Sequence, residues 1–369
     1  MAAVTAKKLL TPVTVGGVEL QNRVALAPMT RGRAEEDGTP NDMMVEYYRQ
    51  RGNMGLLISE GACISKQGHG WHYAPGIYNE QHRDGWKKVV EVVHERGGKF
   101  AMQLWHLGRQ CHSEVTGSPI VAPSPIPMTN DVNAKNGEKR TPEVPQELSE
   151  EGIKEIIEDY GKAAELAMAA GCDFVELHAA NGYLVDLFIQ GKTNQRQDKY
   201  GGSIENRLRF VNEVLDRILE SVPASKVGIK LSPNGVFGEM GTADNTEVFS
   251  ALLESLAARK IAFVDFVDGL AFGFHELHPQ FTLAMARKIL GDKTALFGGC
   301  GYSVEDGEKA IESGDGDMIV YGRPTIGNPD FIERIRDGLE LAEVPPMDVW
   351  YNKAKGREGY VDLERKVPL

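Results

Sequence analysis

Three side chains with complementary chemistry fall within six residues, in the stretch HAANGY at positions 178–183. His178 and Asn181 are three residues apart, so both can point from one turn toward the same side. Each can donate a hydrogen bond to one oxygen, which is how charge developing on an enolate is stabilised. Tyr183 has one phenolic proton and suits acid catalysis in a dry pocket. The alternative is a strand-end turn capped by Asn181 and packed by Tyr183.

Metal chemistry is the less favoured interpretation of the same region. His178 could be a metal ligand together with His106, but no Asp or Glu lies within residues 178–183 to complete a facial set. The four cysteines are far apart and form no CxxC pair, which argues against a zinc ribbon, an iron–sulfur cluster or a disulfide scaffold. We therefore predict that the protein binds no metal.

Two glycine-containing turns near the carboxyl end suggest a phosphate site. The stretch GGCG at 298–301 follows one apolar run, and Tyr321-Gly322-Arg323 ends the next. Glycine lets backbone N–H groups approach phosphate oxygens, and the Arg323 guanidinium can bind a phosphate with two parallel hydrogen bonds. Either turn alone could be an ordinary tight turn, with Arg323 in a surface ion pair. Together they favour phosphate.

Lys230 and Gln103 are polar residues at the ends of apolar runs. A lysine that ends a buried strand is costly unless it faces a polar site, where its charge would suit an anionic cofactor atom. Alternatively, its ammonium extends to the rim of the fold and reaches water. The amide of Gln103 offers both a donor and an acceptor, as the edge of a pyrimidine-dione requires.

The elements that must position these residues form eight pairs of a short apolar run and a helix-like stretch. Such runs are typical of strands buried on both faces, and eight of them predict a parallel (β/α)₈ barrel, a TIM barrel. An open doubly wound sheet is the competitor, but no GxGxxG follows the first run. The expected strands are 24–27, 55–59, 100–104, 174–177, 227–231, 263–267, 295–297 and 318–321; the expected helices are 42–51, 80–96, 149–170, 203–221, 246–259, 278–290, 303–313 and 329–339.

Two further segments complete the expected organisation of one domain spanning residues 1–369. Residues 13–20, with glycines at 16 and 17, predict an N-terminal hairpin that plugs the bottom of the barrel. Residues 113–147 form a long polar loop after the third strand, of the length that lids and binding loops have.

The overall charge of the protein limits the classes of partner that it can bind. Lys and Arg number 41 against 53 Asp and Glu, a net charge of −12, so nucleic acid and anionic membranes are poor partners. The first eight residues lack the apolar stretch of a signal peptide, and no apolar run reaches the 18 residues that a membrane span needs. We expect a soluble cytoplasmic protein.

Five segments in order resemble the old yellow enzyme family of flavin-dependent ene-reductases, and its plant-type branch that includes 12-oxophytodienoate reductase. They are residues 22–30 (NRVALAPMT), 103–106 (QLWH), 176–183 (ELHAANGY), 198–207 (DKYGGSIENR) and 321–323 (YGR). The similarity extends over residues 9–360. It implies an NAD(P)H-dependent oxidoreductase with non-covalently bound FMN, which NADPH reduces before an activated alkene, an enone or a nitroalkene, accepts hydride at its β-carbon.

The resemblance also implies roles for individual residues. Thr30 would bond the flavin carbonyl near N5 and Gln103 the pyrimidine edge, while Lys230 would lie beside flavin N1. His178 and Asn181 would bind the substrate carbonyl oxygen, and Tyr183 would protonate the α-carbon. The remaining expected contacts are the ring with Pro28, Met29 and Gly61, the phosphate with Gly299, Cys300, Gly322 and Arg323, and the substrate with Trp105 and Tyr360, the last closing the pocket.

Three features depart from that family pattern. Members commonly carry arginine at the position of Lys230. The lysine here keeps the positive charge but lacks the planar guanidinium of arginine. Cys300 falls at a variable position, so its phosphate contact is expected through the backbone. Residues 113–147 match no family motif, which leaves the choice of substrate open. The sequence also leaves open whether the protein is a monomer or a homodimer. The competing hypotheses are a Schiff-base aldolase or phosphosugar isomerase using Lys230, and a non-catalytic barrel that binds a flavin or another phosphorylated ligand.

Overall fold

Eight parallel strands close into a barrel, as the sequence predicts. The computed structural model describes residues 7–268 and 276–369. Neighbouring strands pair in the order β3, β4, β6, β11, β12, β13, β14 and β15, and β15 pairs with β3 to close the ring. Their bounds are β3 Val24–Leu26, β4 Leu56–Ile58, β6 Lys99–Trp105, β11 Phe174–Ala179, β12 Val227–Leu231, β13 Phe263–Val267, β14 Ala295–Gly299 and β15 Met318–Tyr321. A short additional strand, β5 (Ala62–Cys63), pairs with the end of β6.

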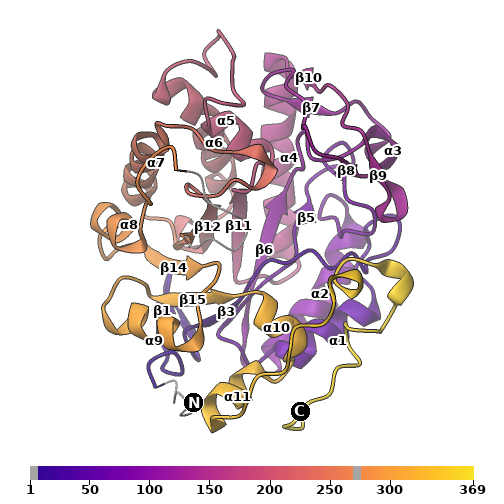
Figure 1. The fold of residues 1–369 in the computed structure, drawn as a ribbon, viewed down its shortest axis with the longest axis vertical. Helices are drawn as coiled ribbons and strands as arrows, with labels where there is room; N and C mark the ends of the chain where they lie inside the picture. Colours follow the sequence, from indigo (N-terminus) through magenta and orange to yellow (C-terminus); the bar gives the residue numbers. More distant parts are fainter. Residues whose placement is uncertain (1–6, 269–275) are drawn as a thin grey trace.

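Helices surround the strands (Figure 1). The expected eight are α1 Asp42–Arg51, α2 Glu80–His94, α4 Glu150–Ala169, α6 Ile204–Leu219, α7 Asn245–Arg259, α8 Leu283–Leu290, α9 Val304–Glu312 and α11 Phe331–Asp337. Helix α8 begins five residues later than predicted, because Thr282 is its N-cap and its Oγ1 accepts a hydrogen bond from the Met285 N–H. Two short helices at the barrel mouth, α5 (Leu184–Ile189) and α10 (Arg323–Gly327), were not predicted.

The amino-terminal end of the barrel is closed by the predicted hairpin. Strands β1 (Val13–Val15) and β2 (Val18–Leu20) pair antiparallel. Val15 and Leu20 join a buried cluster with Phe263 and Phe297 from inside the barrel. Gly16 lies directly against the chain below β12, since a Cβ there would come within 1.9 Å of the Ser225 carbonyl oxygen. Active sites in such barrels lie at the opposite end.

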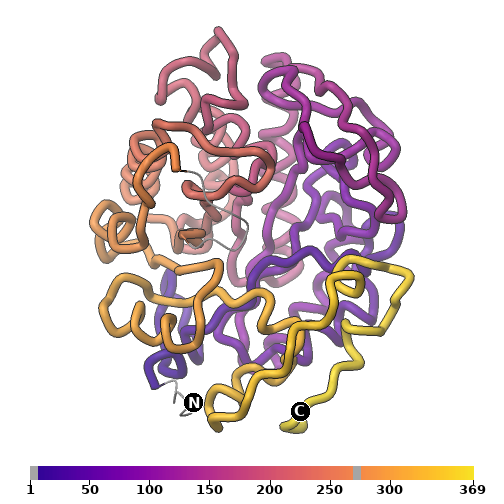
Figure 2. Tube along the Cα trace, viewed as in Figure 1, coloured from indigo at the N-terminus to yellow at the C-terminus, as the bar shows by residue number. Residues whose placement is uncertain are grey.

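The loop at 113–147 is built from short elements at the edge of the molecule (Figures 1 and 2). It contains α3 (Ser113–Thr116), a parallel pair of β7 (Val121–Ala122) with β10 (Gln146–Glu147), and an antiparallel pair of β8 (Val132–Asn133) with β9 (Lys139–Arg140). Single 3₁₀ turns lie at η1 Lys135–Gly137, η2 Ala224–Lys226, η3 Phe237–Glu239, η4 Met347–Val349 and η5 Lys353–Lys355.

The carboxyl-terminal segment returns from α11 toward α1 and the barrel mouth (Figure 2). Arg33, just beyond β3, fixes it by donating hydrogen bonds to the carbonyl oxygens of Val349 (2.6 Å) and Trp350 (2.9 Å). Gln50 at the end of α1 donates to the carbonyl of Val361 at 2.9 Å. Across the described ranges, no helix is long and apolar enough to cross a membrane.

Candidate active site

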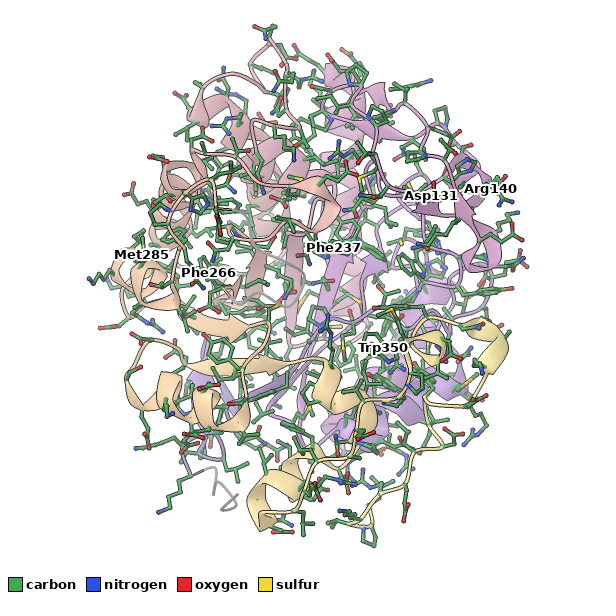
Figure 3. All side chains as sticks on the ribbon, in the orientation of Figure 1. Asp131, Arg140, Phe237, Phe266, Met285 and Trp350 are labelled. Atoms are coloured by element: carbon green, nitrogen blue, oxygen red, sulfur yellow. The ribbon has the colours of Figure 1, made fainter. Side chains whose placement is uncertain are left out.

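A cavity of about 430 Å³ opens at the carboxyl ends of the barrel strands. This volume lies within the range of roughly 300–1,000 Å³ that is usual for small-molecule and cofactor sites. Figure 3 labels Phe237 and Trp350, which come from the segments after β12 and near the carboxyl end, and both line this cavity. Thirteen of the fifteen predicted site residues also line it: Pro28, Met29, Thr30, Gln103, Trp105, His178, Asn181, Tyr183, Lys230, Gly299, Cys300, Gly322 and Arg323.

The His178–Tyr183 stretch brings its three polar groups into this cavity. The rings of His178 and Tyr183 are 4.9 Å apart and tilted by 72°, and Trp105 meets Tyr183 edge to face, also at 4.9 Å. Burial and the charge of Lys230 hold the pKa of His178 well below its usual value, so the imidazole is neutral. Its Nδ1 has no hydrogen-bond partner among the described residues. Burial also raises the pKa of Tyr183, so the phenol keeps its proton at neutral pH.

A buried polar row lies across the barrel below the cavity. Strand register places Gln103 beside Glu176, and Lys230 beside both His178 and Asp265. The Gln103 amide donates to Glu176 Oε1 at 2.7 Å, and the Lys230 ammonium forms an ion pair with Asp265.

The ionisation of this row follows from its burial. Burial and the nearby Asp265 charge raise the pKa of Glu176, which favours its protonated form. Desolvation opposes the charge on Lys230, but the Asp265 carboxylate outweighs it and raises the pKa of Lys230 above its usual value. Lys230 therefore remains a cation held by a carboxylate.

The glycine turns after β14 and β15 form the other side of the cavity. Cys300 and Gly301 both have positive φ, 76° and 106°, so the backbone curls tightly there. A Cβ at Gly322 would lie 3.3 Å from Met29 Sδ, so glycine lets these two lining segments approach. Arg323 reaches the cavity with its guanidinium carbon 5.9 Å from the centre of the Trp350 ring.

This donor set fits FMN. Arg323 and the curled backbone at 299–301 suit a phosphate, while the Gln103 amide and the Lys230 cation suit the polar edge of an isoalloxazine. No group of three His, Cys, Asp or Glu residues that could hold a metal ion occurs in the part of the chain that the structure describes.

Two predicted residues do not line the cavity. A Cβ on Gly61 would lie 2.5 Å from the Trp105 ring, so this glycine makes room for that indole. Tyr360 is fully buried and stacks on Tyr47 with ring centres 4.5 Å apart. The Arg31 and Arg33 guanidinium groups lie 5.0 and 5.1 Å from the Tyr360 ring. Tyr360 is thus not among the residues that line this cavity, and its ring anchors the carboxyl-terminal segment.

Other lining residues were missed or given little weight. Trp350 and Tyr351 line the cavity where Tyr360 was expected, and Phe237 and Arg31 also contribute. The adjacent aromatic pair at 350–351 in a polar stretch was the available signal. Trp71 lines the cavity as well. His106 does not: its Nε2 lies 2.6 Å from Gln67 Oε1, and burial lowers its pKa to about 3.

Known proteins are similar to this chain in both sequence and architecture. Residues 8–342 match the NADH:flavin oxidoreductase / NADH oxidase family. The chain is 36% identical to a probable flavin mononucleotide-dependent alkene reductase of Leishmania infantum, over 96% of each chain. It superimposes on the old yellow enzyme homologue of Zymomonas mobilis with a TM-score of 0.92 at 36% identity, covering 97% of this chain and 99% of that one.

A second solved relative was captured with a nicotinamide analogue. Morphinone reductase in complex with tetrahydroNAD is 35% identical and aligns with a TM-score of 0.90, over 98% of this chain and all of the other. Matches of this extent confirm the resemblance drawn from the five segments. The chain belongs to the old yellow enzyme family of NADH:flavin oxidoreductases.

Proposed function

We propose that this protein is an FMN-dependent alkene reductase that uses NADPH and acts on enones or nitroalkenes. The observation that carries the proposal is the meeting of a neutral imidazole, an amide and a protonated phenol in one cavity, all from residues 178–183. The same cavity offers a cation and a phosphate-binding turn. The family match and the alkene-reductase relative support the same chemistry.

Bound FMN would supply the hydride that saturates the alkene. On this proposal Arg323, Gly299, Cys300 and Gly322 hold its phosphate, with Pro28, Met29 and Thr30 along the ring. Gln103 and Lys230 lie at its polar edge. All of these contacts are non-covalent.

His178 and Asn181 bind the carbonyl oxygen of the substrate. Each donates one hydrogen bond, and together they stabilise the negative charge that develops on that oxygen as the β-carbon is reduced. A neutral imidazole suits this role, because its remaining N–H is a donor while no proton is lost to the enolate. The buried setting strengthens both hydrogen bonds, since water does not compete for the oxygen.

Tyr183 holds the proton that the α-carbon receives. Its ring is fixed between Trp105 and His178, so the hydroxyl keeps a defined position in the cavity. A positioned acid of this kind accelerates proton transfer by about 10²–10⁴.

The state of Lys230 disfavours the Schiff-base alternative. A lysine nucleophile must lose its proton, and such lysines have lowered pKa values. Here the Asp265 carboxylate holds the pKa of Lys230 above its usual value. We therefore assign Lys230 to cofactor binding.

The test is an anaerobic assay of NADPH oxidation with a panel of alkenes. Purified protein should be yellow and should consume NADPH with enones or a cyclopentenone acid, and parallel reactions with NADH give the nicotinamide preference. A yellow protein that oxidises NADPH with none of the alkenes would overturn the proposal and favour a flavin-binding barrel with another role. A colourless protein that does not take up FMN would overturn the cofactor assignment itself.

A further inference from the structure

The turn that carries Asn181 and Tyr183 has an unusual backbone. Asn181 and Gly182 both adopt positive φ, 59° and 70°. Glycine adopts this conformation freely, but a left-handed residue such as Asn181 persists where its surroundings fix it. The Asn181 N–H donates to Ser232 Oγ at 2.8 Å, and its carbonyl accepts from Gln110 Nε2 at 2.7 Å. Side chains that follow two other barrel strands, β12 and β6, therefore hold this residue on both sides.

The next residue, Gly182, is held by a buried acid. Its N–H donates to Asp186 Oδ2 at 2.9 Å, and Asp186 Oδ1 accepts from Gln190 Nε2 at 2.8 Å. Both side chains are fully buried; Asp186 lies in the first turn of α5 and Gln190 is its C-cap. No charged partner of Asp186 occurs among the described residues, and burial raises its pKa to about 7. A carboxylate kept there without a cation is costly to stability.

The hydrogen bonds continue from Gln190 into a second wall of the cavity. Gln190 Oε1 accepts from the Gly241 N–H at 2.9 Å and from Asn245 Nδ2 at 3.3 Å. The segment that ends at Gly241 carries Phe237, which lines the cavity. The two walls also touch, because a Cβ on Gly182 would lie 3.0 Å from the Gly238 Cα.

The direction of this chain of hydrogen bonds is fixed at both ends. Backbone N–H groups can only donate, so Gly182 requires an acceptor on residue 186 and Gly241 requires one on residue 190. Gln190 must then present its amide N–H to residue 186, which must accept twice. In the structure each oxygen of Asp186 accepts from one of these donors, an arrangement that a carboxylate provides and an amide at this position does not.

We infer that Asp186 and Gln190 are positioning residues, which set Asn181 and Tyr183 relative to the Phe237 wall and so control binding and protonation of the substrate. This inference rests on the proposed function. Neither side chain lines the cavity, so both act through the backbone of residues 181–183. A displacement of about 1 Å at such a site can cost about 100-fold in rate.

The variant Asp186→Asn interrupts this series of hydrogen bonds without changing the shape of the side chain at position 186. The oxygen of the new amide can still accept from the Gly182 N–H. Its NH₂ group then faces the NH₂ group of Gln190, and these two donors cannot hydrogen-bond to each other. Gln190 cannot rotate its own amide, because its Nε2 would then face the Gly241 N–H. We expect stopped-flow reduction of 2-cyclohexenone to slow by about 10–100-fold, while flavin reduction by NADPH stays near wild type.

The double variant Asp186→Asn/Gln190→Glu should rescue the defect. The amide at position 186 accepts from Gly182 and donates to the new carboxylate at position 190, whose second oxygen accepts from Gly241 and Asn245. All four hydrogen bonds return with the same total charge. Asp330→Asn is the matched control, because Asp330 is also fully buried but ion-pairs with Arg334 on α11. It should lower the melting temperature and leave both half-reactions in their wild-type ratio.

A binding measurement separates this inference from the proposed function. Titration of the oxidised flavoprotein with 4-cyanophenol should give a long-wavelength charge-transfer band whose affinity depends on His178 and Asn181. Weaker phenol binding by Asp186→Asn, restored in the double variant, would support the inference even if no alkene in the panel were reduced. Wild-type phenol affinity in Asp186→Asn, equal slowing of both half-reactions, or a double variant no better than the single one would overturn it.

Discussion

The two ends of the barrel interior are built from the same strands but have opposite chemistry. At the amino-terminal end, Phe174 on β11 meets Phe263 on β13 with ring centres 5.7 Å apart, and Phe263 stacks on Phe297 of β14 at 4.5 Å. Two residues further along the first two strands stand Glu176 and Asp265, both fully buried. Successive side chains of a strand alternate between faces, so each pair shares the inward direction.

This difference indicates what each end of the barrel interior contributes to stability or to function. Aromatic rings buried at the closed end add stability in proportion to the apolar surface that they remove from water. The buried acids at the open end do not, because desolvation offsets much of what the Asp265 ion pair and the Glu176 hydrogen bond contribute. The polar row is therefore retained for the cavity above it. Substitutions at the open end should change function, and substitutions at the closed end should change stability.

Tyr183→Phe is expected to have the largest effect, confined to one half-reaction. The variant keeps the ring that packs on Trp105 but loses the proton for the α-carbon. Reduction of 2-cyclohexenone should slow by about 10²–10⁴, while flavin reduction by NADPH continues at close to its wild-type rate. Stopped-flow measurement of each half-reaction tests this.

Nitroalkenes are the control for Tyr183→Phe. Their reduction should be affected less, because the nitronate product is stable enough to leave before protonation. Equal slowing of both half-reactions, with a lower melting temperature, would instead make Tyr183 a packing residue.

Phe263→Ala is the matching change at the closed end. Truncating a buried phenylalanine typically costs about 3–5 kcal/mol of unfolding free energy. Urea denaturation should show that loss, while the ratio of the two half-reaction rates stays at the wild-type value under conditions where the variant is folded. A changed ratio would show that the two layers are not independent.

Local sequence features predicted the elements better than the contacts between distant segments. The eight apolar runs predicted the barrel, and the residues that follow them mark its open end, where thirteen of the fifteen candidates line one cavity. The burial of Tyr360 could not be predicted, because the ring it meets, Tyr47, lies more than 300 residues earlier in the chain. Helix α8 begins later than the expected 278–290, because Thr282 caps its first turn.

The polar row and the Asp186–Gln190 pair were missed for related reasons. Glu176 and Asp265 each interrupt an apolar run, which was a usable signal, but only the register of neighbouring strands shows that they meet Gln103 and Lys230. The hydrogen bonds of Asp186 involve backbone groups whose direction the sequence does not reveal.

Arg323→Ala should have an intermediate effect, limited to cofactor retention. A hydrogen bond to a charged group contributes about 1.5–3 kcal/mol, so the variant should bind FMN about 10- to 100-fold more weakly. Dialysis followed by fluorescence titration with FMN measures this. Lys309→Ala on the exposed face of α9 is a control that should leave FMN affinity unchanged. Undiminished affinity in Arg323→Ala would remove this arginine from the cofactor site.

Glu176→Gln should change stability in a way that depends on pH. Burial and Asp265 raise the pKa of Glu176 above its ordinary value of 4.5, so the folded protein keeps a proton that the unfolded chain releases. Wild-type stability should therefore fall as pH rises from about 4.5 toward the raised pKa, by at most about 1.4 kcal/mol per pH unit from this group. Glutamine copies the protonated acid and keeps the acceptor for Gln103, so the variant lacks this slope. Urea denaturation at about pH 5 and about pH 8 should show the variant gaining on wild type at the higher pH. A constant difference between the two proteins would mean that Glu176 is ionised in the folded state, and that the polar row carries a net negative charge beneath the cavity.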